Sequence, residues 1–146
     1  MSTDLYDTDL HAWATGNAAL IRAGRLAEVD FEHVAEELES MGASERNALN
    51  SRMTELLLHL LKWRFQSERR GASWEVSIIK QRNAIADLLD ASPSLRPRLP
   101  DVLAKTWPRA RRLAVAETRL PAETFPDTCP FALADVLDAE HWPEPA

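Results

Sequence analysis

Glycine, cysteine and β-branched aliphatic residues are scarce in this chain of 146 residues. Its four glycines are isolated, so the sequence has no glycine-rich loop of the kind that cradles phosphate. It also lacks the Gly-x-Ser-x-Gly turn that presents a nucleophilic serine. The sole cysteine, Cys129, excludes an internal disulfide and argues against a cysteine-based zinc site. Valine and isoleucine together number 10, whereas leucine and alanine number 42, and this imbalance favours helices over strands.

Long apolar runs are absent as well. The run from Leu56 to Leu58 stops at His59, whereas a membrane-spanning helix needs about 20 apolar residues. Residues 1–9 carry three acids and no base, which is the reverse of the basic start of a secretory signal. These absences predict a protein without a membrane-spanning segment and a cytoplasmic location.

Charge is distributed unevenly along the chain, although the net charge is only −6. Residues 1–45 hold ten acids and two bases, and residues 120–146 hold six acids and no base. Between them, residues 46–90 carry a net charge of +3 and residues 96–119 a net charge of +5. Such asymmetry indicates either a surface for a partner or acidic and basic segments that face each other in one fold.

The spacing of apolar residues predicts five main helices and one short terminal helix. Asp30 and Ser44 are suited to begin helices, because their side chains can accept hydrogen bonds from free backbone N–H groups. Gly24 and Gly42 are suited to follow helix ends, where the backbone turns into the left-handed region. The predicted helices cover residues 8–23, 30–41, 44–65, 73–90, 100–119 and 131–137.

The helix predicted over residues 44–65 is the central one, because it is apolar over much of its circumference. Leu49, Met53, Leu56 and Leu60 recur at helical spacing on one side of it. The other helices carry apolar stripes that we expect to pack against it. In the first two helices these stripes are Leu10, Trp13, Leu20 and Ile21, and then Phe31, Val34, Leu38 and Met41.

Proline shapes the C-terminal third of the chain. Pro100 suits the first turn of a helix, whereas Pro108 predicts a kink or break near Thr106. Five further prolines follow Leu120 and predict an irregular segment. The predicted fold class is all-α, an irregular bundle of about five main helices around a long central helix, with a Pro-rich C-terminal segment. We expect a single domain over residues 1–146.

Several ordered blocks of the sequence carry a resemblance to a known family. The first is Tyr6-Asp7-Thr8-Asp9 followed by Trp13, and the second is Ala35-Glu36-Glu37-Leu38-Glu39-Ser40-Met41-Gly42 followed by Ser44-Glu45-Arg46. The third is His59-Leu60-Leu61-Lys62-Trp63, with weaker additions at Pro93-Ser94-Leu95-Arg96-Pro97 and Ala116-Glu117-Thr118. Together they resemble the bacterial family of uncharacterised proteins catalogued as domain of unknown function 29, over nearly the whole chain.

The resemblance implies a compact all-α fold and a bacterial source. The family carries no established activity, so the resemblance assigns no catalytic residue. Its third block draws attention to His59, Lys62 and Trp63, which we keep as binding candidates, although a shared block can equally reflect packing. Pro108 departs from the expectation of a straight helix.

Histidine and carboxylate pairs are the first candidates for chemistry. His33 and Glu37 lie four residues apart and could begin a metal site with ligands from elsewhere, although a solvated polar face is the favoured interpretation. His59 lies at the edge of an apolar face, with Glu55 four residues before it. It could act as a general base, but a half-buried histidine that bonds a neighbouring segment is commoner. We therefore predict no metal, no cofactor and no catalytic residue.

A basic stripe is the second candidate. Lys105, Arg109, Arg112 and Arg119 recur on one side of the predicted helix over residues 100–119. Such a stripe could lie along phosphates, but the acidic protein as a whole would repel nucleic acid. An acidic surface of this protein or of another protein is the favoured partner.

Cys129 precedes Pro130 near the predicted terminal helix. A helix N-terminus can lower the pKa of a thiol and make it reactive. No spacing signature supports such a role, and an ordinary thiol is favoured.

Three functions remain open on the sequence alone. The leading hypothesis is a non-enzymatic protein-interaction module, which could self-associate, because charge is polarised and no reactive signature is present. The second is a small nucleic-acid-associated regulator that uses the stripe from Lys105 to Arg119. The third is a helical-bundle enzyme or metal binder near His59, or at His33 and Glu37; an enzyme is not favoured, because no Glu-x-x-His pair of the kind that bundles use for metals is present.

Overall fold

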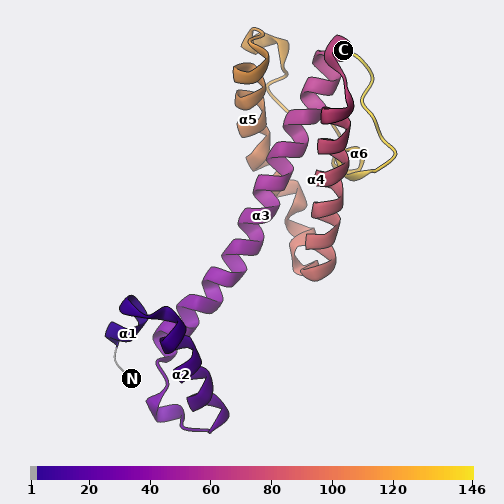
Figure 1. Cartoon of the computed structure of the whole chain (residues 1–146). Helices are drawn as coiled ribbons and strands as arrows, with labels where there is room; N and C mark the ends of the chain where they lie inside the picture. Colours follow the sequence, from indigo (N-terminus) through magenta and orange to yellow (C-terminus); the bar gives the residue numbers. More distant parts are fainter. Residues whose placement is uncertain (1–2) are drawn as a thin grey trace. The chain divides into compact units, whose positions relative to one another are not determined.

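The computed structural model describes the backbone of residues 3–146 and the side chains of residues 5–146, and within them every regular element is helical (Figure 1). The all-α fold class is therefore confirmed, with six α-helices and four short 3-10 helices in the described part. The α-helices are α1 (Thr3–Thr8), α2 (Leu10–Arg22), α3 (Phe31–Phe65), α4 (Ala72–Ala91), α5 (Leu99–Thr118) and α6 (Leu133–Leu137). The 3-10 helices are η1 (Leu26–Glu28), η2 (Ser67–Arg69), η3 (Pro93–Arg98) and η4 (Ala122–Thr124).

The chain divides into two compact units. The N-terminal unit comprises residues 1–44 and the C-terminal unit residues 45–146. Helix α3 contributes its first turns to the N-terminal unit and its remaining length to the C-terminal unit. A single domain over the whole chain stays a prediction.

The two helices predicted over residues 30–41 and 44–65 form one helix, so the predicted break at Gly42 is wrong. Helix α3 runs through 35 residues, and neither Gly42 nor Ser44 interrupts it. A glycine inside a helix costs only about 1 kcal/mol relative to alanine. Gly42 stands between Met41 and Ala43, which are both good helix formers, so this cost is not enough to end the helix.

The N-terminal unit has few buried side chains. Asp9 begins α2 by accepting a hydrogen bond from the backbone N–H of Ala12 at 3.1 Å. Gly24 adopts a φ of +73°, as predicted for a residue after a helix end. Among the described side chains of this unit, only Trp13, Asn17 and Val29 are buried.

The apolar stripes predicted for the first two helices are largely exposed, which corrects the expectation that they pack into the shared core. Phe31, Leu38 and Met41 expose 53%, 62% and 67% of their surface. Leu10 and Ile21 are exposed as well. These residues do recur along helices, but an amphipathic pattern does not say whether the apolar face packs against its own chain or against a partner.

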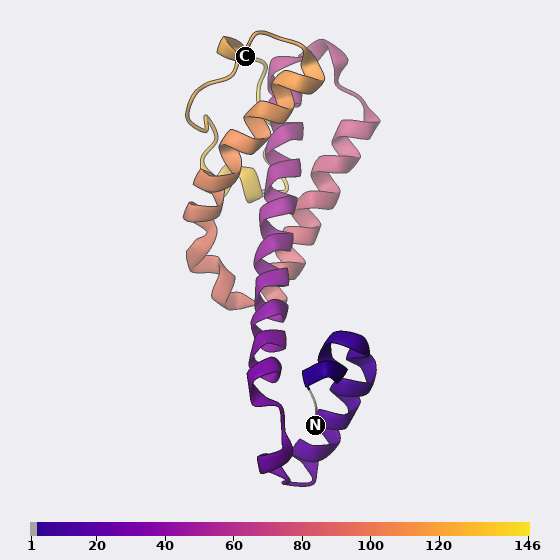
Figure 2. The same ribbon diagram turned by 90° about the vertical axis from the view of Figure 1, so that its left-hand side faces the viewer.

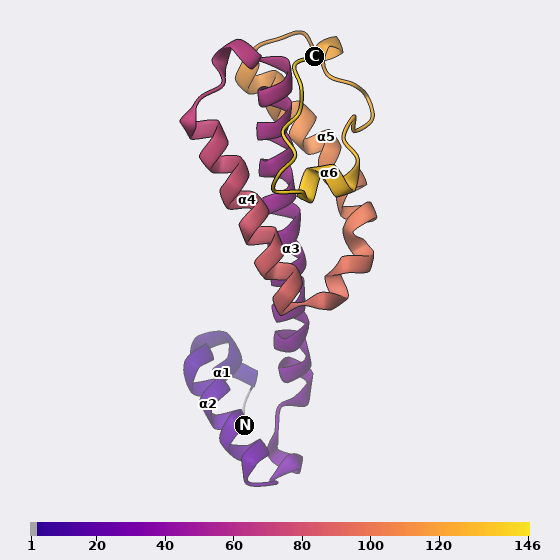
Figure 3. The same ribbon diagram turned by 90° about the vertical axis from the view of Figure 1, so that its right-hand side faces the viewer.

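The C-terminal unit has a continuous apolar core. Helix α3 lies between α4 and α5 (Figures 1 and 3), and the same arrangement is seen from the other side in Figure 2. The α3 residues of this core were predicted, and Leu56, Leu57 and Leu60 are at most 1% exposed. The other helices add Ile78, Ile85 and Leu89 from α4, Leu99, Val102, Trp107, Ala110 and Ala114 from α5, and Val136 from α6.

Helix α5 begins with Pro100 in its first turn, as predicted, and continues through Pro108 to Thr118. The break expected near Thr106 is therefore absent. Pro108 cannot donate to the carbonyl of Ala104, but Ala104 is exposed and water can replace that bond. Buried Trp107 and Ala110 hold the helix against the core on both sides of the proline.

The Pro-rich C-terminal segment packs against the core instead of lying only on the surface. Val136 in its short helix α6 is buried, and so is Phe125 in the segment before it. Arg111 donates hydrogen bonds to the carbonyl oxygens of Ala122 at 2.7 Å and Phe125 at 3.2 Å. Such bonds satisfy backbone groups in a segment that has no long helix or sheet of its own. Across residues 3–146, no helix combines the length and the apolar character that crossing a membrane requires.

Candidate binding groove between α3 and α5

Two hollows follow one another along the seam between α3 and α5 in the C-terminal unit. The first has a volume of about 260 Å³. Arg46 and Asn50 border it from α3, Arg98 from η3 and Lys105 from α5. The remaining lining residues are Asn47, Leu49, Leu95, Asp101 and Val102.

The second hollow has a volume of about 410 Å³ and continues along the same two helices. Arg109, Arg112 and Leu113 border it from α5, and Ser51, Thr54 and Glu55 from α3. We call the two hollows together the α3–α5 groove. Leu113 adds an apolar element to it, because this side chain is 40% exposed.

The basic side chains of the α3–α5 groove form no ion pair with an acidic side chain among the described residues. Arg46, Arg98, Lys105, Arg109 and Arg112 are all exposed, and none has an ion pair or a side-chain hydrogen bond with another described residue. By contrast, the neighbouring Arg111 is engaged by backbone carbonyls and by Asp127 at 3.6 Å. Two carboxylates, Asp101 and Glu55, also border the groove and leave it with a net positive charge.

The arrangement of the α3–α5 groove suits binding of an anionic surface. Arginine offers several N–H donors in a planar fork, and the amides of Asn47 and Asn50 add further donors and acceptors. The groove holds no histidine or cysteine to move a proton or attack a substrate. Its arginine and lysine side chains are therefore equipped to hold an anion.

The structure brings together three of the residues selected from the sequence. Lys105, Arg109 and Arg112 share the α3–α5 groove, as their spacing on one helix face suggested. Arg119, the fourth member of the predicted stripe, stands outside the helix. It follows the last residue of α5 with a φ of +61° and borders neither hollow.

The other three selected residues lie elsewhere in the C-terminal unit. His59 is half-buried, and its Nδ1 donates to the carbonyl oxygen of Glu55 at 2.8 Å. Lys62 lies 3.7 Å from a carboxylate oxygen of Glu117 and 5.0 Å from the ring centre of Trp74. The close surroundings of Lys62 are thus already filled by its own chain.

Trp63 takes part in an aromatic contact with the C-terminal segment. Its ring centre is 4.8 Å from that of Trp142, and the guanidinium of Arg70 lies 4.8 Å from the same ring. Arg70 also donates to the carbonyl oxygens of Trp63 at 2.7 Å and Pro143 at 3.1 Å. These contacts tie the end of α3 to the C-terminal segment.

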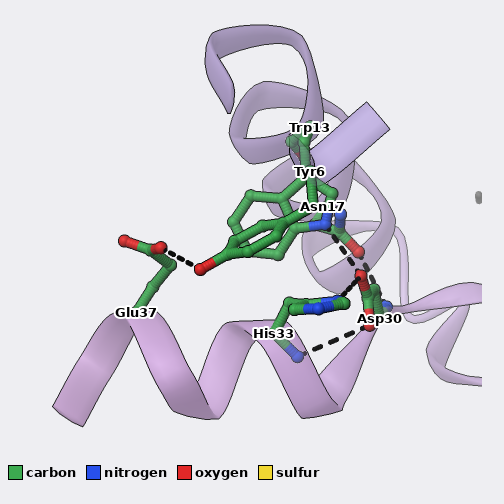
Figure 4. A network of polar contacts seen from close by, with 6 residues as sticks. All are labelled: Tyr6, Trp13, Asn17, Asp30, His33 and Glu37. Carbon is green, nitrogen blue, oxygen red and sulfur yellow. Dashed lines mark hydrogen bonds and ion pairs between the residues drawn. The ribbon is translucent and has the colours of Figure 1, made fainter. Parts of the chain in front are cut away.

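A polar network stands in the N-terminal unit (Figure 4), and Asp30 is its centre. The indole N–H of Trp13 donates to Asp30 Oδ2 at 2.9 Å, and His33 Nδ1 lies 2.7 Å from the same oxygen. Asn17 accepts from the backbone N–H of Asp30 at 2.8 Å and donates to the carbonyl of Trp13 at 2.9 Å. Three segments of the unit are joined in this way: α2, the residue before α3 and the first turn of α3.

Tyr6 extends the network on the side of α1. Its ring stacks on the imidazole of His33 with 4.0 Å between the ring centres, and its hydroxyl donates to Glu37 at 2.5 Å (Figure 4). This hydrogen bond, together with desolvation, raises the pKa of Tyr6 to about 12. Hydrogen bonds from Trp13 and His33 lower the pKa of Asp30, and the bond to Asp30 raises the pKa of His33.

The geometry of this network does not bring His33 and Glu37 together as the start of a metal site. Nδ1 of His33 is engaged by Asp30, and Glu37 is engaged by Tyr6. Within residues 3–146, no cluster of three or more His, Cys, Asp or Glu side chains could hold a metal ion. The hydrogen bonds of the network hold segments of the N-terminal unit together.

Arg82 is a buried cation in the C-terminal unit. It is 5% exposed and donates to the carbonyl oxygens of Val136 at 2.9 Å and Asp135 at 3.2 Å, while Trp142 lies beside its guanidinium. Burial lowers the pKa of Arg82. Its Nη1 is buried without a hydrogen-bond partner among the described residues. These hydrogen bonds fix α6 against α4, because Arg82 on α4 donates to carbonyl oxygens in the last turn of α6.

Cys129 is half-buried and precedes α6 by four residues, so it does not occupy the start of that helix. Its thiol contacts the carbonyl oxygen of Phe131 at 3.5 Å. Burial raises the pKa of Cys129, which reduces the fraction of reactive thiolate at neutral pH.

The fold and the α3–α5 groove define an all-α protein that carries a basic groove on its C-terminal unit. The chain matches the family described as domain of unknown function DUF29 over residues 5–142, and it belongs to that family. The resemblance in the sequence blocks is thereby confirmed. No curated protein and no solved structure matches the chain.

Sequence reasoning missed Arg46, Asn50 and Arg98 as parts of the groove. A signal was present, because Arg46 and Asn50 are four residues apart and Arg98 stands seven residues before Lys105. The pairing of α3 with α5 was needed to bring the two patterns together. The Asp30 network was missed as well, because Asp30 was interpreted from the sequence only as a residue that begins a helix.

Proposed function

We propose that this chain is a non-enzymatic binding module that recognises a protein surface in the bacterial cytoplasm. Self-association is included in this proposal. Its single cysteine suits a reducing compartment, and the exposed guanidinium groups of the α3–α5 groove suit an acidic protein surface.

The observation that carries the proposal is the apolar surface of the N-terminal unit. Phe31, Leu38 and Met41 lie on one side of α3, and each exposes more than half of its surface. Leu10 and Ile21 on α2 and Leu26 in η1 add exposed apolar side chains to the same unit. Scattered exposed leucines are ordinary, but six large hydrophobic side chains in a unit of 44 residues are typical of a surface that meets a partner.

A site-specific photo-cross-linker tests this proposal. Placed at Leu38, it should form a covalent adduct with one defined protein, whereas the same group at Ile79 on α4 should not. Ile79 is a matched control, because it is also an exposed aliphatic residue on a helix. Absence of any specific adduct at Leu38, in cells and in extract, would contradict a protein-binding role for this surface.

A second candidate is a nucleic-acid-associated regulator, and the unpaired bases of the α3–α5 groove favour it. Binding to phosphates would weaken steeply as salt rises, because counterions are released on association. The acidic N-terminal unit and the net charge of −6 oppose it. Retention on a DNA or RNA column at low salt, lost in the variant Arg109→Glu/Arg112→Glu, would support this function; no retention at low salt excludes it.

A further inference from the structure

We infer that the N-terminal unit of one copy docks into the α3–α5 groove of a second copy. The docking surface consists of the apolar residues Phe31, Leu38 and Met41 and the neighbouring acids Glu32 and Glu39. We call these five residues together the acidic stripe. This inference rests on the proposed binding function and names the partner.

The acidic stripe is regular along α3. Phe31 and Leu38 are seven residues apart, and so are Glu32 and Glu39, so each pair forms a line along one side of the helix. All four side chains are exposed. Neither glutamate has an ion pair or a hydrogen bond among the described residues. The stripe therefore combines an apolar line with a line of unpaired negative charge.

The α3–α5 groove has the complementary pattern. Lys105 and Arg112 are also seven residues apart on one side of a helix, with Arg109 between them and exposed Leu113 beside them. At a rise of 1.5 Å per residue, a separation of seven residues corresponds to about 10 Å on either helix. Each glutamate of the acidic stripe could then meet one base of the groove, while Leu38 meets Leu113.

Charge decides which surfaces of two copies pair. Two acidic stripes placed face to face would oppose four carboxylates, in a region where residues 1–45 carry ten acids and two bases. Two grooves placed face to face would oppose five bases with five bases. Like-charge contacts are destabilising and opposite-charge contacts guide association, so the acidic stripe and the groove are the favoured pair.

Contact between two unlike surfaces has a consequence for the assembly. It closes into a dimer if each copy inserts its acidic stripe into the groove of the other, and it forms open chains if the contact is not reciprocal. In both cases the mass should grow with protein concentration. The attraction should also weaken with salt, since exposed charges are screened.

Sedimentation velocity of the full chain over a range of concentrations tests the inference in about 0.05 M and about 0.5 M salt. We expect a concentration-dependent increase in mass at low salt and a much smaller one at high salt. The variants Glu32→Lys/Glu39→Lys and Lys105→Glu/Arg112→Glu should each lose at least 10-fold in association constant. Mixing these two variants should restore association between them. The charge-reversed acidic stripe of one variant then meets the charge-reversed groove of the other, and the two surfaces again carry opposite charges.

Matched controls separate this contact from a general effect of charge. Glu75→Lys/Asp87→Lys makes the same change at two exposed positions of α4 and should associate like the unaltered chain. Circular dichroism confirms that each variant is folded. If a reversed variant does not fold, the milder Lys105→Gln/Arg112→Gln replaces it and should weaken association by a smaller factor.

Three results would overturn the inference. A chain that stays monomeric at all concentrations has no second copy as partner; an adduct of the Leu38 cross-linker with a different protein would then still support the proposed function. Association that persists in both variants, or that their mixture does not restore, uses another surface. Retention of an oligonucleotide that depends on Lys105 and Arg112, with no self-association, assigns the groove to nucleic acid.

Discussion

The two units of this protein are stabilised in different ways. The C-terminal unit buries leucine, isoleucine and aromatic side chains from four α-helices and from the segments around them in one continuous core. Among its side chains from Leu5 onward, the N-terminal unit buries one tryptophan, one valine and one asparagine, and a hydrogen-bonded network around Asp30 joins its helices. Both units consist of amphipathic helices, but only one of them uses most of its apolar surface for its own core.

This difference indicates which unit contributes most of the free energy of folding. Burial of apolar surface contributes about 25 cal/mol per Å², whereas a typical hydrogen bond contributes only about 1 kcal/mol net. The C-terminal unit should therefore hold most of the stability. The N-terminal unit should open more readily, and its exposed stripe gains most from a partner.

The largest effect should come from truncating the core. Leu57→Ala removes a side chain that is 0% exposed and should lower the free energy of unfolding by about 2–5 kcal/mol, because it leaves a cavity. Leu38→Ala makes the same change on the same helix at an exposed position and should change it by no more than about 0.5 kcal/mol. Urea denaturation followed by circular dichroism measures both. Similar losses in the free energy of unfolding for the two variants would show that both units are stabilised by burial in one common hydrophobic core.

An intermediate effect is expected at Arg82. Arg82→Met keeps much of the side-chain volume but removes the donors to Val136 and Asp135, and leaves their carbonyls without these partners. We expect a loss of about 1–3 kcal/mol, together with faster proteolysis of the segment after Leu120. Arg98→Met is the control, because Arg98 is exposed and makes no such bonds. A cost at Arg98 equal to that at Arg82 would contradict the role of the buried donors.

The N-terminal unit should show its own dependence on pH. The pKa of His33 is raised above 6.5, so its stabilising contribution is complete below that pH and is lost as the pH rises through the higher folded value. The pKa of Asp30 is lowered below 3.8, so its contribution is present above that pH and is lost as the pH falls through the lower folded value. The unit should therefore be most protected between these two limits.

Hydrogen exchange measures this pH dependence. After correction for the intrinsic rate, amides of α2 should exchange most slowly between about pH 4 and pH 6.5, while amides of α4 serve as an internal reference. Asp30→Asn should flatten the profile of α2 and leave that of α4 unchanged. A flat profile in the unaltered chain would show that the pair of Asp30 and His33 does not stabilise the unit.

The smallest and most local effect is at Tyr6, which is the only tyrosine. Its ultraviolet titration should have a midpoint at about 12, because ionisation breaks the bond to Glu37 and places two negative charges together. Glu37→Gln should move the midpoint down toward the ordinary value of 10.0. A midpoint at that ordinary value in the unaltered chain would mean that Tyr6 and Glu37 are not bonded in solution.

The sequence predicted the C-terminal unit better than the N-terminal unit, and the reason is physical. Leu49, Met53 and Leu56 lie on a helix that is apolar on several sides, which only a buried position satisfies. Phe31 and Leu38 lie on a simple amphipathic stripe, which suits a core and a docking surface equally. Gly42 was expected to end a helix, but continuity of the flanking turns outweighed its small cost.

The candidate site was predicted in part for a similar reason. Lys105, Arg109 and Arg112 lie on one helix, so their spacing alone placed them together. Arg46 and Asn50 lie more than fifty residues earlier in the chain, and only the packing of α3 against α5 makes them part of the groove. Spacing also failed for His33, whose partner Asp30 precedes α3 and had been considered only as a helix cap.

The sequence by itself determined the helical class, most helix positions and the segregation of charge, because these follow from local propensity and from periodicity along the chain. Tertiary structure decided which apolar faces are buried, which bases share a groove, and that Asp30 joins Trp13 to His33. Those properties depend on contacts between residues far apart in the chain, and the pattern of a single helix carries no information about what lies opposite it.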